Sequence, residues 1–188
     1  MEEIRCSWCL SSPEYIDYHD NEWGIPVYDD VSLFECMTLE SAQSGLSWIT
    51  ILRKREGYRT AFYQFDPVKV ASMTEQDVER LLQDEGIVRH RGKIEATINN
   101  AKVFLKIADE FGSFSQYFWA FSDNKVIDNQ VKELADVPAV TDLSKHIAKE
   151  FKKRGVKFLG PTTCYAFMQA TGMVNDHIAD CIARKRTE

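Results

Sequence analysis

Hydrophobic and polar positions alternate with a helical period along most of the chain. The clearest stretch runs from about Gly92 to Phe111. Its apolar residues recur every three or four positions and form one stripe: Ile94, Ile98, Ala101, Phe104, Leu105 and Ala108. Such a stripe is typical of an amphipathic helix that packs on a core. The pattern therefore predicts one long helix near the middle of the chain.

Capping signals divide the remaining sequence into further helices. Asp29 or Asp30 can begin a helix over 31–43, and Ser47 can begin another after Gly45. Asp66-Pro67 and Thr74-Glu75-Gln76-Asp77 are typical starts of two short helices, the second of which we expect to end by Gly86. Further helices are expected near 113–121, 141–154 and 161–171. Only 125–131 favours a strand, too isolated for a sheet. We predict one all-α domain over 1–188.

Composition is consistent with an ordered globule. The 188 residues are 44% hydrophobic and 28% charged, with only 5 Pro and 9 Gly. No apolar run reaches membrane-spanning length, so no membrane partner is expected. The start, MEEIRCSW, is acidic and lacks the basic and apolar parts of a signal peptide. We therefore expect a cytoplasmic protein whose five cysteines are reduced, as metal ligands or core thiols rather than disulfides.

The charge balance leaves a nucleic-acid partner open. The net charge is −6, and phosphate binding normally requires an excess of Lys and Arg. Basic residues nevertheless cluster at 53–55, 89–93 and 152–157. Each cluster is also consistent with a solvated helix face. Composition alone thus neither requires nor excludes DNA.

Cysteine and histidine form two half-sites far apart in the sequence. Cys6 and His19 are a C-x12-H pair, and His177 and Cys181 are an H-x3-C pair. The second spacing places both side chains on one face of a helix, one turn apart. Two Cys and two His complete the closed tetrahedral type of site that holds structural Zn²⁺. Singly, each residue is equally consistent with core packing, and Cys9 is an alternative ligand that we expect to pack instead.

Two segments are dense in side chains that can recognise a ligand, 15–24 and 39–48. Glu40 lies on an otherwise apolar helix face, where a carboxylate is costly unless it is paired, hydrogen-bonded or protonated. Four aromatic residues accompany it: Tyr15, Tyr18, Trp23 and Trp48. Together they favour a pocket that stacks on a flat ligand, whereas Glu40 alone suits a helix cap and each aromatic suits the core. No glycine-rich phosphate loop, G-x-S-x-G or H-E-x-x-H motif occurs.

Several longer segments resemble the 3-methyladenine DNA glycosylase I family. They are CSW, Y-I-x-Y-H-D-N-E-W-G, L-E-S-x-Q-S-G-L-S-W, F-D-P-x-K-V, G-I-V-R-H-R-G-K-I, K-x-R-G-x-K-F-x-G and C-Y-x-F-M-Q-A-x-G-x-V-N-D-H. The resemblance extends from Cys6 to Cys181 and is weakest between about 110 and 142. It implies an all-α fold of the helix-hairpin-helix glycosylase type, with the hairpin at about 83–96.

The resemblance also implies a site and an activity. It places one structural zinc on Cys6, His19, His177 and Cys181. It assigns the base pocket to Trp8, Tyr15, Tyr18, Trp23, Glu40 and Trp48. Glu40 and Tyr18 would read the base edge, Trp48 would stack on the ring, and Leu46 would fill the gap left by the flipped nucleotide. The implied protein is a monomeric, monofunctional glycosylase that removes 3-methyladenine from double-stranded alkylated DNA in the bacterial cytoplasm, at the nucleoid.

This sequence departs from the family pattern at a few positions. The hairpin Gly86-Ile87-Val88-Arg89 lacks a second Gly, and Ala166 stands where relatives can carry a small hydroxyl residue. Related glycosylases place an Asp beyond the hairpin; Asp109 has that position, but we expect it on the surface. An alternative function is a zinc-stapled protein that binds alkylation damage without excising it. A zinc hydrolase is a third, disfavoured because four protein ligands leave no site for water.

Overall fold

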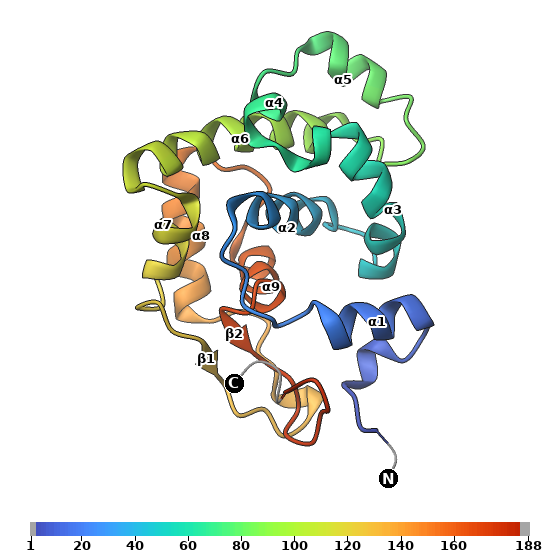
Figure 1. Cartoon of the computed structure of the whole chain (residues 1–188), viewed down its shortest axis with the longest axis vertical. Coiled ribbons are helices and arrows are strands. Elements are labelled where there is room, and N and C mark those ends of the chain that lie inside the picture. The colour runs from blue at the N-terminus through green and yellow to red at the C-terminus, as the bar shows by residue number, and fades with distance from the viewer. Residues whose placement is uncertain (1–2, 185–188) are drawn as a thin grey trace.

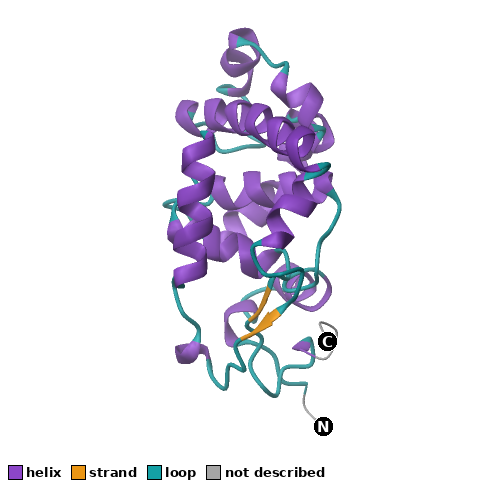
Figure 2. Ribbon diagram, turned by 90° about the vertical axis from the view of Figure 1, so that its left-hand side faces the viewer, coloured by secondary structure: helices purple, strands orange, loops and turns teal. Residues whose placement is uncertain are grey.

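The computed structural model describes residues 3–184, and nearly all of their regular structure is helical (Figures 1 and 2). The α-helices are α1 (Pro13–Asn21), α2 (Asp30–Ala42), α3 (Trp48–Ala61), α4 (Pro67–Ala71), α5 (Glu75–Leu81), α6 (Arg91–Phe111), α7 (Phe114–Ala120), α8 (Asp142–Arg154) and α9 (Pro161–Ala170). Short 3-10 helices occur at Ser7–Cys9, Tyr63–Phe65 and Leu134–Asp136. No helix within residues 3–184 is long and apolar enough to cross a bilayer.

Local capping chemistry explains where several helices begin. The Asp66 side chain accepts hydrogen bonds from the backbone N–H groups of Val68 and Lys69, and Pro67 opens α4. Thr74 and Asp77 form the reciprocal capping box of α5, with the Thr74 N–H donating to Asp77 Oδ2 at 2.7 Å. The predicted helices are therefore present, each within a few residues of its expected ends.

The central helix α2 is surrounded by other elements. It contacts α3, α6, α7 and α9, and Figure 1 shows it crossing the middle of the molecule. All six residues from Met37 to Ala42 are buried. Because this C-terminal half of α2 is covered on every side, even its polar side chains lie in the interior. This arrangement places Glu40 inside the protein.

Two expectations from the sequence are wrong. The His177-to-Cys181 segment is not a helix: it follows strand β2 (Val174–Asn175) as a loop with turns, and the Ile182 N–H donates to the Ile4 carbonyl at 2.9 Å. Long-range contact with the N-terminal segment therefore determines its shape. The isolated strand also has a partner, since β1 (Ile127–Asp128) pairs in parallel with β2.

The N-terminal and C-terminal segments lie side by side. Figure 1 shows the first and last described residues at the same end of the molecule, below α1 and β2. Cys6, Cys181 and Ala183 form a small buried cluster separate from the main core, and Trp8 and Ile178 pack against it. Helix α1, absent from the sequence-based prediction, connects this cluster to the interior. The cluster and the C-terminal half of α2 thus flank the same region.

Candidate functional site

A cavity of about 230 Å³ opens between α1, α2, the start of α3 and α9. Its lining is Trp8, Tyr15, Tyr18, Trp23, Glu40, Gln43, Trp48, Leu134, Val137, Ala166, Gln169 and Asp176. Four of the twelve are Trp or Tyr residues from the first 23 positions. Pockets that combine aromatic walls with a few polar groups are typical small-ligand sites.

Glu40 is the unusual polar group of this cavity. Its side chain belongs to the buried end of α2, and the residue is only 5% exposed. Its carboxyl group has no hydrogen-bond or ion-pair partner among the described residues. Burial raises the pKa of Glu40 to about 8, so the group is mostly protonated at neutral pH. A buried carboxyl group without a protein partner is suited to a ligand that supplies one.

The aromatic walls are arranged in two groups. Tyr18 and Trp48 lie 5.5 Å apart between ring centroids and are tilted by 44°. Trp8 meets Tyr15 at 5.1 Å and Trp23 at 5.0 Å, edge to face in both pairs. Burial, and then the charge of Glu40, raise the pKa of Tyr18 well above 10. The Tyr18 hydroxyl therefore remains a neutral hydrogen-bond donor beside Glu40.

A second buried carboxylate, Asp176, lines the same cavity but is fully engaged. Asn129 Nδ2 donates to its Oδ1 at 2.7 Å. The Tyr165 hydroxyl and Gln169 Nε2 both donate to its Oδ2, the latter at 2.9 Å. This network joins the residue after β1, α9 and the segment after β2. Asp176 therefore holds one wall of the cavity in position.

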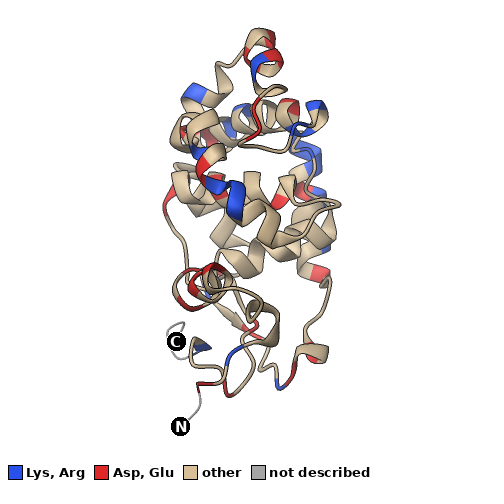
Figure 3. Ribbon diagram, turned by 90° about the vertical axis from the view of Figure 1, so that its right-hand side faces the viewer, with Lys and Arg blue, Asp and Glu red and all other residues tan. Residues whose placement is uncertain are grey.

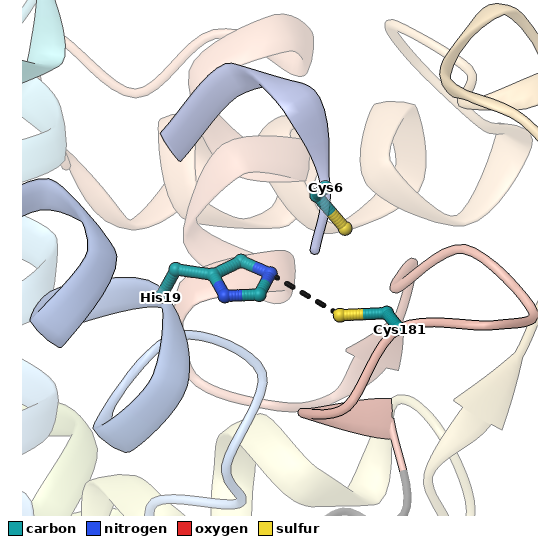
Figure 4. Close-up of side chains that lie close together, drawn as sticks. All are labelled: Cys6, His19 and Cys181. Carbon is teal, nitrogen blue, oxygen red and sulfur yellow. Dashed lines mark hydrogen bonds between the residues drawn. The ribbon is translucent and has the colours of Figure 1, made fainter. Parts of the chain in front are cut away.

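Three potential metal ligands meet next to the cavity (Figure 4). The ligand atoms of Cys6, His19 and Cys181 lie within 4.8 Å of one another, and all three residues are buried. His19 Nε2 is 3.5 Å from Cys181 Sγ, while its Nδ1 is 2.8 Å from Asp20 Oδ1. Hydrogen bonds from Cys6 and then from His19 lower the pKa of the Cys181 thiol. The same hydrogen bond between Cys6 and Cys181, and then burial, raise the pKa of Cys6, so without a metal the cluster favours a thiolate at Cys181 alone.

His177 lies beside this group, although its ligand atoms are not within the same distance limit. Its ring centroid is 5.1 Å from that of His19. The Nδ1 atom is 3.0 Å from Asn175 Oδ1, which leaves Nε2 buried without a partner in the described structure. Burial lowers the pKa of His177 to about 4, so the ring is neutral. An unpartnered neutral imidazole nitrogen is suited to a metal ion.

Cys9 is outside the cluster. Its Sγ donates to the Cys6 carbonyl at 3.1 Å, and the residue is fully buried. This contact gives Cys9 a packing role close to the cluster.

The six predicted pocket residues all line the cavity, and three of the four predicted metal ligands form one group. Leu46 lies elsewhere, 38% exposed on the loop between α2 and α3. Asp109 is exposed on α6. The sequence analysis missed five lining residues: Gln43, Leu134, Val137, Gln169 and Asp176. Gln43 and Asp176 stand in segments already singled out, whereas nothing in the sequence around Leu134 and Val137 indicates a pocket.

Lys and Arg residues are interspersed with Asp and Glu residues along the helices in Figure 3, and several basic side chains of α3 and α6 form ion pairs. Arg55 forms an ion pair with Glu22 at 2.5 Å. Arg91 contacts Glu75, Glu79 and Glu95. Arg89, in the connection between α5 and α6, is exposed and has no ion pair among the described residues. The basic clusters at 53–55 and 89–93 are therefore less cationic than their sequence indicates.

Comparison with known proteins adds an independent result. Residues 8–185 match the family model for methyladenine glycosylase. The chain belongs to the methyladenine glycosylase family. DNA-3-methyladenine glycosylase 1 of Escherichia coli (strain K12) is 52% identical over 177 residues, which cover 94% of this chain and 95% of that protein. The family thus accounts for nearly the whole molecule.

Solved structures of methyladenine glycosylases have the same fold. A crystal structure of 3-methyladenine DNA glycosylase I is 52% identical, with a TM-score of 0.93 over 95% of this chain and 98% of that one. The Staphylococcus aureus 3-methyladenine DNA glycosylase I, whose structure addresses 3-methyladenine recognition, is 43% identical with a TM-score of 0.93, over 96% of each chain. The cavity of this methyladenine glycosylase family member therefore lies in a fold that these solved structures share.

Proposed function

We propose that this protein is a DNA glycosylase that removes 3-methyladenine from alkylated DNA by hydrolysing the N-glycosidic bond. The observation that carries this function is Glu40, whose buried carboxyl group lies inside an aromatic cavity and has no hydrogen-bond or ion-pair partner within residues 3–184. Methylation at N3 gives the adenine of a nucleotide a positive charge. That charge compensates for burying a carboxylate, whereas neutral adenine does not. The pocket therefore selects the damaged base.

Recognition is divided between Glu40 and the aromatic residues. The Glu40 carboxylate accepts hydrogen bonds from the base edge, and the Tyr18 hydroxyl supports the same edge. Trp48 stacks on the ring, while Trp8, Tyr15 and Trp23 enclose it. An aromatic face attracts a cation by about 0.5–2 kcal/mol, with the larger values in dry sites. Several such faces around one cationic ring favour its extrusion from the duplex, which costs roughly a few kcal/mol.

Excision needs little activation of the leaving group. The bond between C1′ and N9 breaks, and its electron pair leaves with the base, which becomes neutral. A water molecule forms the new bond to C1′ and releases one proton. No Lys lines the cavity among the described residues, so no amine is placed to attack C1′. We therefore propose a monofunctional enzyme that leaves an abasic site uncut.

The DNA would contact two elements outside the cavity. The connection from Leu82 to His90 joins α5 to α6, and we assign it as the hairpin of the helix-hairpin-helix motif, with its backbone N–H groups facing phosphates. Leu46 follows Gly45, whose φ of +80° suits a glycine, at the tip of the exposed loop. We assign to Leu46 the filling of the gap left by the flipped nucleotide. We propose that residues 1–188 act as one monomeric domain at the nucleoid. Of these, residues 1–2 and 185–188 lie outside the described structure.

We propose that Cys6, His19, His177 and Cys181 hold one structural Zn²⁺. Two thiols and two imidazoles are the donor set that this ion prefers, and the unpartnered His177 Nε2 supports the fourth position. Bound zinc would supply a cross-link between the two ends of the chain. His19 follows Tyr18 directly, and Trp8 packs edge-on against His19 at 5.2 Å. The metal would therefore fix two pocket walls without taking part in hydrolysis.

Removal of the metal should destabilise the protein strongly. Binding of structural Zn²⁺ can contribute roughly 10 kcal/mol or more to small domains. We expect a strong chelator to lower the melting temperature and to abolish excision, and Zn²⁺ to restore both. Metal analysis of the purified protein should give one zinc per chain. A metal-free protein with full stability and activity would contradict this assignment.

The function is tested by incubating the protein with methylated duplex DNA and separating the released bases by chromatography. We expect free 3-methyladenine, with the DNA strand uncut until alkali is added. Binding to methylated DNA without base release, by folded and metal-loaded protein, would instead support the alternative of a damage-binding module. Strand cleavage in the absence of alkali would contradict the monofunctional mechanism.

A further inference from the structure

Lys93 joins two parts of the protein that are distant in sequence. It lies in the first turn of α6, immediately after the connection from α5. Its ammonium group donates to the Ala42 carbonyl at 2.9 Å and to the Ser44 carbonyl at 2.6 Å. Both carbonyls belong to the segment where α2 ends and the loop to α3 begins. Lys93 therefore links the start of α6 to the base of that loop.

This contact satisfies groups that the end of a helix leaves unpaired. The last carbonyls of an α-helix have no partner within the helix, and a cation there also interacts favourably with the helix dipole. Burial lowers the pKa of Lys93, because the ammonium group has lost part of its hydration. Lys93 acts as a C-terminal cap of α2 supplied by another helix.

The loop beyond α2 has few other restraints. Its tip is the turn in which the Leu46 N–H donates to the Gln43 carbonyl at 2.7 Å. A Cβ atom placed on Gly45 would meet nothing within 4 Å, so the tip projects into open space. Among residues 3–184, Lys93 is the only residue of another element whose side chain hydrogen-bonds the backbone of 42–46. Lys93 therefore contacts the base of the loop, two residues before Leu46.

The other end of the link is the connection between α5 and α6. The Lys93 N–H donates to His90 Nδ1 at 3.1 Å, so His90 caps α6. Two residues earlier, the Val88 N–H donates to the Tyr58 hydroxyl at 3.2 Å. The backbone on which Lys93 stands is therefore continuous with the segment assigned to phosphate binding.

We propose that Lys93 is a positioning residue that couples phosphate contact at 82–90 to insertion of Leu46 into the duplex. The inference rests on the proposed glycosylase function, because both contacts are contacts with DNA. Lys93 is not a phosphate ligand in this arrangement, since its ammonium group is directed to two carbonyls of the protein. Its role is to hold the Leu46 loop at a fixed place relative to the hairpin when DNA docks.

The test uses the variant Lys93→Met, which keeps the length of the side chain and removes its donors. We expect single-turnover excision from a duplex with one 3-methyladenine to fall by roughly 100-fold, because a displacement of about 1 Å can cost that much. Affinity for free 3-methyladenine, measured by quenching of tryptophan fluorescence, should not change. Lys93→Arg, which retains a cation and donors, should recover most of the activity. Lys106→Met is the matched control on the exposed face of α6, about 20 Å along the helix.

A double-mutant cycle separates coupling from a general structural effect. If Lys93 acts through Leu46, Lys93→Met should have little further effect once Leu46→Ala is present. The inference would be overturned if the double variant lost excision by the product of the two single-variant losses. It would also be overturned if Lys93→Met lost as much affinity for the free base as it lost excision. Full duplex activity of Lys93→Met would overturn it as well. If Lys93→Met does not fold, Lys93→Gln carries the same cycle. A wild-type protein that releases no 3-methyladenine would refute the proposed function itself, which is a distinct result.

Discussion

The cavity contains two buried carboxyl groups in opposite situations. Asp176 is 1% exposed and accepts hydrogen bonds from three side chains. Glu40 is 5% exposed and has no hydrogen bond or ion pair within residues 3–184. A buried polar group without a partner costs roughly 1–3 kcal/mol, and more if it is charged. Asp176 therefore stabilises the protein's own structure, whereas Glu40 remains available to bind a ligand.

The difference teaches how a pocket can be rigid and selective at the same time. Asp176 connects the residue after β1, α9 and the segment that carries His177, so its hydrogen bonds are made before any ligand arrives. Under the proposed function, Glu40 would reach its favourable state only when a cation enters. A base without positive charge would leave Glu40 protonated or unpaired. Selectivity for the methylated base would thus follow because Glu40 has no partner among residues 3–184.

The largest expected effect is the loss of excision activity in the Glu40→Gln variant. This change keeps the shape of the side chain and removes the charge, and the loss of one preorganised electrostatic contact typically costs about 10²–10³ in rate. We expect single-turnover release of 3-methyladenine to fall by that factor while the circular dichroism spectrum is unchanged. Asp176→Asn is the matched control, an acid-to-amide change in the same cavity. Equal activity of Glu40→Gln and wild type would remove Glu40 from base recognition.

The next effect is a pH dependence of ligand affinity. Because the pKa of Glu40 is about 8, the carboxylate that binds a cation is scarce below that pH. Affinity for 3,9-dimethyladenine, whose ring has a fixed positive charge, should rise by about tenfold per pH unit up to that value and then level off. Titration calorimetry from pH 6 to 9 measures this slope. Glu40→Gln should have a flat profile, and a flat profile in the wild type would contradict the protonated state.

The same pKa has an opposite consequence for stability. The folded pKa of Glu40 is above its ordinary value of 4.5, so between these two values the folded state holds a proton that the unfolded state has lost. Glu40 therefore makes the protein less stable as pH rises from 4.5 to 8, and the change ends above 8. Each pKa unit corresponds to about 1.4 kcal/mol. Denaturant unfolding should show that Glu40→Gln is the more stable protein at pH 8.

The smallest expected effect separates Asp176 from Glu40. In Asp176→Asn one acceptor oxygen is replaced by a donor that faces donors, so we expect the free energy of unfolding to fall by roughly 1–3 kcal/mol. Excision at a temperature where the variant is folded should fall much less than in Glu40→Gln. Urea unfolding together with the same base-release assay gives both quantities. Loss of excision with unchanged stability would mean that Asp176 also contacts the substrate.

Local sequence signals predicted much of the fold. The capping residues Asp66 and Thr74 act within one turn of their own helices, so a short segment contains all the information. The start of α1 has such a signal as well, since Ser12 accepts a hydrogen bond from the Tyr15 N–H and Pro13 follows it. The polar and aromatic run after Pro13 obscured the helical period there.

Features set by distant contacts could not be predicted in the same way. The spacing of His177 and Cys181 suits a helix, but the Arg184 side chain donates to the His177 carbonyl at 2.8 Å and Ile4 pairs with Ile182. These contacts determine a loop. Leu134 and Val137 line the cavity from a segment without a clear period. The six residues that the family resemblance assigned to the base pocket line the cavity, and that assignment used whole motifs rather than single positions.

The meeting of Cys6 and His19 with Cys181 also has a consequence for biosynthesis. The ribosome makes Trp8, Tyr15, Tyr18 and Trp23 more than 150 residues before Cys181. If the proposed metal holds these aromatic walls, they would become fixed only after the segment with His177 and Cys181 has been made. A nascent chain that stops before His177 would therefore lack a finished pocket.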